Sequence, residues 1–422
     1  MRKALASFCF LLGVILFTVT ALAAPASNSK TVVIRGKWVW DGTGKGAIPN
    51  GVIVVQGDQI VAVGTGNQLS LPADAIVIDH SDLFLMPGLV NSHEHFSLDQ
   101  FAGTDEAGLM LMPSSYLALR AARNGRTSLR SGVTTARVPG DKDFVDIQYK
   151  RAFEEGLLPG PRLVVASRFI RPPDGFPNYA GLGPAPSGKE ELRRFIRENI
   201  RAGADFCKMF ISGTGVSVEG DNTVVDAIYF TKEEIETIVG ECHRHNKKVT
   251  AHVHKGGPSF QWAIEAGIDA FEHGFFLTEE EMRQLRDRSI FLVIGASRWL
   301  VPGGEYVGIP APPDGEALLR RWYETAVKVR PKLAVGVDGL HEPGAMAKEV
   351  AVLVRYGLTN EEALLIATRS GGELTGLPVG TLEPGEYADV IGVRGNPLEE
   401  ISALQQVEFV MKGGKVYLLS EQ

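Results

Sequence analysis

The chain has 422 residues, of which 44% are hydrophobic, and 43 Lys and Arg residues against 50 Asp and Glu residues give a formal net charge of −7. This length and apolar content are ample for a sizeable core and exceed the usual span of one compact domain, so we expect two domains. The mildly acidic balance and the lack of a basic tract argue against nucleic acid as a partner.

Residues 1–24 have the features of a secretory signal peptide. Arg2 and Lys3 precede an apolar run that ends in ALA, a small-residue cleavage site of the A-x-A kind. The alternative is a membrane anchor, which is less favoured because the run is near the short limit for spanning a bilayer. We therefore expect cleavage after Ala23 or Ala24, a periplasmic or secreted mature protein, and no stable membrane span once the signal is removed.

The chain has few cysteines. Cys9 would leave with the signal peptide, and the loss of Arg2 and Lys3 would take the net charge from −7 to −9. The remaining Cys207 and Cys242 make neither a disulfide framework nor a zinc ribbon, although one disulfide between them stays open.

Short β-type runs punctuated by glycine occur toward both ends of the chain. TVVIRGKWVWDG and GVIVVQGDQIVAVG lie near the start, and GTLEPGEYADVIGVRGNP and VEFVMKGGKVYLL lie near the end. Such runs are typical of antiparallel sheet with tight turns. We predict one small discontinuous β-sandwich domain, built from residues 30–82 and 376–422.

The middle of the chain, residues 83–375, alternates short apolar runs with amphipathic segments, which predicts βαβ units and a parallel sheet. Eight strands are expected, at 83–90, 134–138, 162–167, 205–211, 248–253, 269–273, 290–294 and 332–337. Helices are expected between most of them, at 189–203, 231–247 (with Thr231 and Glu234 as a capping box), 258–267, 278–288 and 313–330. The segment is close to the roughly 250 residues of a (β/α)8 TIM barrel, an α/β fold.

Metal-capable residues gather at the carboxyl ends of these strands, where the active site of such a barrel lies. His93 and His95 follow the first strand. Because residues i and i+2 of a strand point to the same side, both rings can converge on one ion. An isolated His-x-His is more often a solvated strand end, but further candidates follow at the ends of later strands: Lys208, His252, His254, His273 and Asp338.

Five short motifs therefore occur in a fixed order: HEH, the lysine of AGADFCKMFISG, AHVH, FEHG and GVD, inside a flanking β domain that ends in LEPGEYADVI. Together they resemble the amidohydrolase superfamily with a binuclear metal centre. IEAGIDAFEHG and the tail NEEALLIATRSGGELTGLPVGTLEPG are similar to one branch, which contains metal-dependent dipeptidases and prolidases, Xaa-Arg carboxypeptidases and ochratoxin-type amidases.

The resemblance implies two divalent ions, with zinc expected and manganese or cobalt also compatible with such ligands. It implies six ligands, which are His93, His95, Lys208, His252, His273 and Asp338. The HEH histidines and the aspartate would hold the more buried ion, and the other two histidines would hold the second. The lysine would bridge both, because nearby cations favour its neutral amine, which can add carbon dioxide to form a carbamate. An ordinary ion pair of this lysine is the alternative.

The same resemblance implies a mechanism. A hydroxide that bridges the metal ions, with its pKa lowered toward neutrality, would attack the substrate carbonyl. Asp338 is the expected catalytic residue, which would take the proton of the hydroxide and deliver it to the leaving nitrogen.

Other histidines have more than one interpretation. Spacing alone does not decide between His252 and His254 as the ligand on the fifth strand; the family motif favours His252, which leaves His254 near the substrate or as a hydrogen-bonded neighbour of the ligands. His243 and His245 are interpreted as a solvated helix end. His341 is either a substrate contact or a loop histidine.

Four residues are candidates for binding a substrate carboxylate by loop position alone: Arg171, Tyr229, His254 and Arg298. The long loop between Gly295 and Pro313 carries Trp299 and Tyr306, which suggest an apolar wall or the packing of a lid.

The leading functional prediction is an exported metal-dependent amidohydrolase that cleaves an amide C–N bond in a dipeptide or an N-acyl amino acid. The alternative keeps the metals but changes the substrate to a carbamate, phenylurea or lactone, including xenobiotics and mycotoxins. A mononuclear deaminase is less favoured because those relatives do not use the bridging lysine, and a noncatalytic exported binding protein is less favoured because the ligand set is complete. A homo-oligomer stays open.

Overall fold

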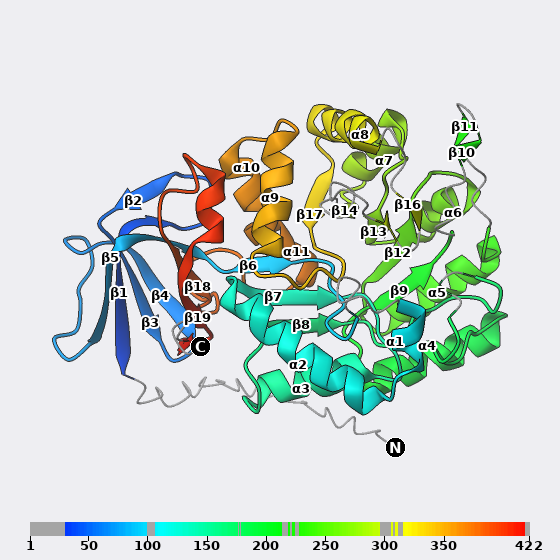
Figure 1. Cartoon of the computed structure of the whole chain (residues 1–422), viewed down its shortest axis with the longest axis horizontal. Coiled ribbons are helices and arrows are strands. Elements are labelled where there is room, and N and C mark those ends of the chain that lie inside the picture. The colour runs from blue at the N-terminus through cyan, green and yellow to red at the C-terminus, as the bar shows by residue number, and fades with distance from the viewer. Residues whose placement is uncertain are drawn as a thin grey trace, which may run out of the picture.

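The computed structural model describes residues 30–98, 106–175, 177, 179–212, 218–219, 222–223, 228–295, 305–306, 309–310 and 315–417. The expected signal peptide, Arg298 and Trp299 lie outside the described residues. Figure 1 shows a sheet at one end of the molecule and parallel strands surrounded by helices at the other. Among the described residues, none of the helices has the length and apolarity needed to cross a membrane.

Strands from both ends of the chain lie in one eight-stranded sheet. Its order is β20-β19-β18-β5-β1-β3-β4, with β2 paired to β1. The strands are β1 (Thr31–Trp40), β2 (Ala47–Pro49), β3 (Gly51–Gln56), β4 (Gln59–Thr65), β5 (Ile76–Pro87), β18 (Val390–Val393), β19 (Val407–Lys412) and β20 (Lys415–Tyr417). β1 and β5 run parallel, whereas β18 pairs antiparallel with β5. The pairing gives a single mixed sheet, so the two-sheet sandwich stays a prediction.

The strand expected at 83–90 is divided in the structure, so its predicted extent is wrong. Residues up to Pro87 belong to β5, and β6 (Leu89–Asn91) begins the parallel strands. The backbone N–H of Gly88 donates to the carbonyl of Asp389, just before β18 of the eight-stranded sheet. The backbone N–H of Leu89 donates to the carbonyl of Gly132, just before β7 (Val133–Val138) of the parallel strands. A Cβ at Gly88 would lie 2.1 Å from Thr134 Oγ1, so only glycine fits where the chain crosses between the sheets.

Parallel strands occur at the seven later predicted positions, and β6 overlaps only the end of the first; all of them lie in a three-stranded and a five-stranded sheet. The first sheet holds β6, β7 (Val133–Val138) and β8 (Arg162–Val165); the second holds β9 (Cys207–Phe210), β12 (Val249–Val253), β13 (Ala270–His273), β14 (Phe291–Ile294) and β17 (Lys332–Val335). Backbone hydrogen bonds join the sheets on both sides: Ser92 N to Val335 O at 2.9 Å, and Ile170 N to Lys208 O at 3.0 Å.

Helices follow most of these strands. They are α1 (Glu106–Leu111), α2 (Ser114–Arg130), α3 (Val145–Glu154), α4 (Lys189–Ala202), α5 (Lys232–Arg244), α6 (Pro258–Ala266), α7 (Glu279–Asp287), α8 (Gly315–Val329), α9 (Ala345–Arg355), α10 (Asn360–Leu365), the π-helix η2 (Ile366–Ser370), α11 (Gly371–Thr375) and the 3₁₀-helix η3 (Ile401–Gln405). Two short hairpins pair β10 (Val218–Glu219) with β11 (Asn222–Thr223), and β15 (Glu305–Tyr306) with β16 (Ile309–Pro310).

The start of α5 shows how local sequence sets these helices. The predicted capping box is confirmed: the Thr231 side chain accepts from Glu234 N, and the Glu234 side chain accepts from the N-cap backbone. The buried face of α5 then packs toward β9, where Cys242 forms a disulfide with Cys207. The pairing that the sequence left open is therefore present, one residue from Lys208.

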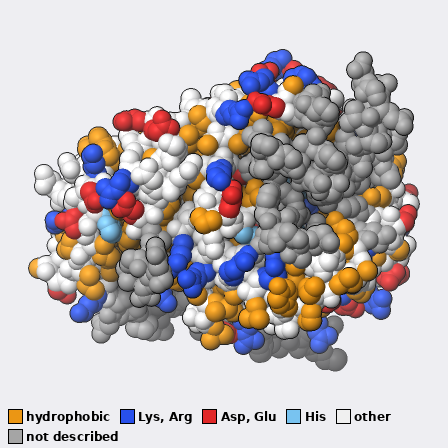
Figure 2. Space-filling model, in the orientation of Figure 1, with side chains coloured by type: hydrophobic (Ala, Val, Ile, Leu, Met, Phe, Trp, Pro, Cys, Tyr) orange, Lys and Arg blue, Asp and Glu red, His pale blue; other side chains and the backbone are white. Residues whose placement is uncertain are grey.

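Charged residues of both signs are spread over the face shown in Figure 2, and apolar side chains gather over α1 and α2. Leu111, Met112, Tyr116 and Leu119 are exposed there.

Candidate metal centre

The HEH segment follows β6 and alternates its side chains between two sides. His93 and His95 face one another, with their Nε2 atoms 3.2 Å apart. Glu94 is turned away and buried; its carboxylate accepts hydrogen bonds from Asn91 Nδ2 at 2.8 Å, His95 N at 2.8 Å and Gly339 N at 3.1 Å. Glu94 thus ties this segment to the loop after β17.

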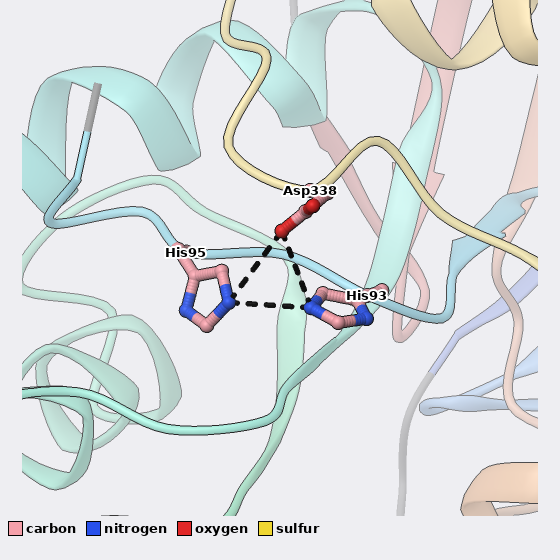
Figure 3. A group of neighbouring side chains, drawn as sticks. All are labelled: His93, His95 and Asp338. Carbon is pink, nitrogen blue, oxygen red and sulfur yellow. Dashed lines mark hydrogen bonds and ion pairs between the residues drawn. The ribbon is translucent and has the colours of Figure 1, made fainter. Parts of the chain in front are cut away.

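That loop brings Asp338 to the two histidines, as Figure 3 shows. Asp338 Oδ1 lies 3.3 Å from His93 Nε2 and 3.7 Å from His95 Nε2. The three residues form a group that could hold a metal ion, with one ligand atom from each lying within 4.8 Å of the others. Residues 245 positions apart in the chain are thereby brought together.

The backbone at two expected ligands is unusual. His273 has a φ of 72° and Asp338 has a φ of 51°, both in the left-handed region that residues other than glycine rarely adopt. Such conformations concentrate at functional sites because the surrounding structure must hold them. Gly336 allows the loop after β17 to approach the HEH segment, since a Cβ there would lie 2.3 Å from His93 N.

Glu272 in β13 contacts His93 at Nδ1, the ring nitrogen that does not face Asp338. Its Oε2 lies 2.8 Å from His93 Nδ1, and its Oε1 accepts from Arg137 Nη1 at 2.7 Å and from Thr250 Oγ1 at 2.6 Å. Arg137 Nη1 also donates to Ser92 O at 3.2 Å. These contacts leave the Nε2 of His93 facing Asp338.

Three further histidines complete a buried cluster: His252 in β12, His254 just after β12, and His273 in β13. The ring centroid of His252 lies 4.7 Å from those of both His254 and His273, and the centroid of His273 lies 4.9 Å from that of His93. The ring of His252 also stacks on Phe210 at 4.9 Å. The structure therefore brings both candidates on the fifth parallel strand to the same place.

The protonation of the cluster fits metal binding, because neutral imidazole is the form that ligates an ion. Burial, together with His93, lowers the pKa of His95 to about 3, and burial lowers that of His254 to about 3. Burial also brings the pKa values of His252 and His273 well below the ordinary value.

The ring of His93 differs from the others, because two carboxylates face it. Burial lowers its pKa, but Asp338 and Glu272 together raise it above the ordinary value.

Lys208 lies in β9 and is only 2% exposed. Burial lowers its pKa to about 8, with Glu272 opposing and Arg137 reinforcing the shift. The Lys208 charge in turn acts on the imidazoles of His95, His252 and His254, so this amine belongs electrostatically to the cluster. A larger neutral fraction of the amine is what addition of carbon dioxide requires.

Three predicted substrate contacts remain: His341, Arg171 and Tyr229. The Nε2 of His341 lies 3.2 Å from His95 O and 2.5 Å from Leu98 O, contacts that favour its interpretation as a loop histidine. Arg171 donates to Gly183 O at 3.3 Å. The Tyr229 ring lies beside Gly175, since a Cβ on that glycine would be 3.1 Å from Tyr229 Cδ2.

The CHRHNK histidines lie at the end of α5, as expected. His243 Nε2 is 2.9 Å from Asp269 Oδ2, and His245 Nε2 is 3.3 Å from Glu241 Oε1. Both are exposed.

Sequence reasoning missed Glu94, Arg137 and Glu272, which surround the expected ligands. A signal for all three is present: each is a charged residue in, or just after, a segment that is otherwise apolar or metal-binding. A buried charge needs a partner, but the partner is separated from it by up to 245 residues and is not visible in the sequence.

Histidines and one carboxylate gather at the carboxyl ends of the parallel strands, and this arrangement is typical of metal-assisted hydrolases with an α/β fold. A family model described as "Amidohydrolase family" matches residues 84–417. The chain therefore belongs to the Amidohydrolase family and is a hydrolase that acts on C–N bonds.

Ochratoxinase of Aspergillus niger is 30% identical over 442 residues, covering 93% of this chain and 88% of that protein. The crystal structure of A. niger ochratoxinase has a TM-score of 0.79 at 27% identity, covering 92% of this chain and 96% of the other. A crystal structure of a Xaa-Pro dipeptidase with bound methionine in its active site has a TM-score of 0.78 at 26% identity, covering 92% and 100%. These neighbours imply a TIM-barrel-type α/β fold.

Proposed function

We propose that this protein hydrolyses the amide bond of a dipeptide or an N-acyl amino acid with two divalent metal ions, zinc in the first instance. The observation that carries the proposal is the group formed by His93, His95 and Asp338, with one ligand atom from each within 4.8 Å of the others. The substrate class is supported by the relatives, an ochratoxinase and a Xaa-Pro dipeptidase.

The chain's own donors suit such ions. His93, His95 and Asp338 would hold one ion, and the neutral rings of His252 and His273 would hold the other. The ring of His254 lies 4.7 Å from that of His252 and stacks on Phe275 at 6.0 Å, and His254 would contact the substrate. When bound, the two ions supply Lewis acidity toward a carbonyl oxygen and a hydroxide nucleophile at neutral pH.

Lys208 would bridge the ions as a carbamate. The carbamate would form when the neutral Nζ bonds to the carbon of carbon dioxide and loses one proton, which leaves one negative charge shared by two oxygens. The lowered pKa of the Lys208 amine, about 8, supports this role, because a buried ammonium beside metal ions would repel them.

Asp338 would act as the catalytic proton carrier. One carboxylate oxygen faces the two HEH histidines, and the other would take the proton of the attacking hydroxide and deliver it to the leaving nitrogen. The loop that carries Asp338 is held by Gly339 N, which donates to the buried Glu94. A fixed carboxylate keeps the proton transfer in reach of both the nucleophile and the leaving group.

Three finer points belong to the proposal. The parallel strands close into a (β/α)8 barrel, supported by the backbone hydrogen bonds at both sheet junctions. The β domain of residues 30–82 and 376–422 is a sandwich beside the barrel of residues 83–375. Export to the periplasm or medium is supported by the composition of residues 1–24, and cell fractionation of the full chain tests it.

The experiment is a substrate panel for the purified, zinc-supplemented protein: dipeptides and N-acyl amino acids, with aryl carbamates, phenylureas and lactones beside them. Amino acid release from the first two classes, lost in Lys208→Ala and kept in the surface control Lys328→Ala, is the expected result. Turnover restricted to carbamates, phenylureas or lactones would refute dipeptides and N-acyl amino acids as the substrate class, but it would not contradict the proposed metal centre.

A further inference from the structure

Behind the expected metal ligands lies a buried polar network that no ligand assignment explains. Its centre is Glu272, a fully buried carboxylate in β13. Arg137 on β7 is 3% exposed and reaches the same carboxylate. A carboxylate and a guanidinium in an apolar interior are costly to desolvate, so their presence calls for a function that apolar residues would not serve.

The contacts show what the network does to one ligand. Glu272 Oε2 lies 2.8 Å from His93 Nδ1. A carboxylate can only accept, so the proton of this hydrogen bond must be on Nδ1. In the neutral ring, Nε2 then carries the lone pair, and Nε2 is the atom that faces Asp338 and His95.

Arg137 and Thr250 keep Glu272 in this role. Both donate to Oε1, at 2.7 and 2.6 Å, which leaves Oε2 for the histidine. Arg137 Nη1 also donates to Ser92 O at 3.2 Å, so the same guanidinium holds the backbone just before His93. Its other side stacks on the ring of Phe206, with the Arg137 Cζ 4.1 Å from the ring centroid.

We propose that Glu272 and Arg137 are positioning residues for the metal centre: Glu272 sets the tautomer and orientation of His93, and Arg137 holds both Glu272 and the HEH backbone in place. This inference rests on the proposed function, because His93 must bind an ion for its tautomer to matter. Through this network, residues of β7, β12 and β13 and the segment after β6 together fix the position of His93 Nε2.

The substitution Glu272→Gln keeps the size and shape of the side chain but removes its negative charge. The amide has one acceptor and one donor group, so if its oxygen accepts from Arg137 and Thr250, its NH2 group faces His93 Nδ1. The ring then places its own proton on Nε2, which blocks the lone pair that should meet the metal. A loss of metal affinity of about 10- to 100-fold is expected, as for other groups that orient metal-binding histidines.

The test measures zinc affinity by competition with a chelator on the full chain. Glu272→Asp is the second variant: it keeps a negative charge in the network, and because its side chain is one methylene shorter we expect it to lose the hydrogen bond to His93. The matched control is Glu316→Gln, an exposed carboxylate beside Arg355 on the surface.

Weaker zinc binding in both Glu272 variants, with wild-type affinity in Glu316→Gln, supports the inference. Wild-type zinc affinity in Glu272→Gln or in Glu272→Asp would overturn it. A wild-type protein that binds no divalent ion would contradict the proposed function, whereas equal zinc binding by the wild type and the variants would contradict only the role of Glu272.

Discussion

Adding one methyl group at Gly336 should damage the candidate metal centre without changing the side chain of any expected ligand. Gly336 follows β17, and the Cβ of an alanine there would lie 2.3 Å from His93 N, 2.7 Å from His93 Cβ and 2.8 Å from His93 Cα. Carbon atoms pack best at roughly 3.5 Å or more, so the HEH segment would have to move by about 1 Å. Two segments that the native backbone brings together would be pushed apart.

The magnitude follows from this displacement. Overpacking of a tight interior site costs about 1–3 kcal/mol of stability. A shift of about 1 Å at a catalytic group can cost on the order of 100-fold in rate. We therefore expect Gly336→Ala to fold, to unfold at a lower temperature, to bind zinc more weakly, and to lose about two orders of magnitude in kcat/KM.

The assay combines thermal unfolding, zinc affinity and amide hydrolysis, with Gly240→Ala as the control. Gly240 lies within α5, where an added Cβ meets nothing within 4 Å. Alanine there should leave activity unchanged and stabilise the protein by up to about 1 kcal/mol. Wild-type zinc affinity and activity in Gly336→Ala would refute the close approach of the two segments on which the site depends.

Three further perturbations test single parts of the site. Asp338→Asn should lower turnover by about 10²- to 10⁴-fold, because an amide cannot carry the proton, while zinc content measured by mass spectrometry stays largely intact; a near-normal kcat would contradict the proton-carrier role. His341→Ala should lower zinc affinity, because the ring contacts the carbonyls of His95 and Leu98, whereas a rise in KM alone would restore its interpretation as a substrate contact. Dialysis against a chelator should abolish hydrolysis and lower the unfolding temperature, both restored by zinc, and full activity after complete metal removal would exclude a metal-dependent reaction.

The strands and the metal-capable residues could be predicted because each leaves a local pattern. Alternation of apolar runs with amphipathic helices gave the eight parallel strands, and histidines at the ends of those runs gave the cluster around His93 and His252. The expected extent of the first strand failed at Gly88, because 83–90 is apolar throughout and the change of sheet is set by partners at Gly132 and Asp389.

The residues that hold the expected ligands could not be assigned in the same way. Arg137 occurs in a run that predicts a buried strand, and Glu272 stands beside a histidine of the cluster, so the sequence shows that both are unusual. Their purpose depends on a hydrogen bond between Glu272 and His93, across 179 positions of the chain, which only the folded structure reveals. The left-handed backbone of His273 and Asp338 is likewise a product of tertiary structure.

The most direct test of the central claim is the metal content of the purified protein, measured by inductively coupled plasma mass spectrometry after growth with zinc. We predict two ions per chain in the wild type, and a content reduced to at most one in the double variant His93→Ala/His95→Ala. A wild-type protein with no more metal than that double variant would contradict the assignment of this cluster as the metal centre.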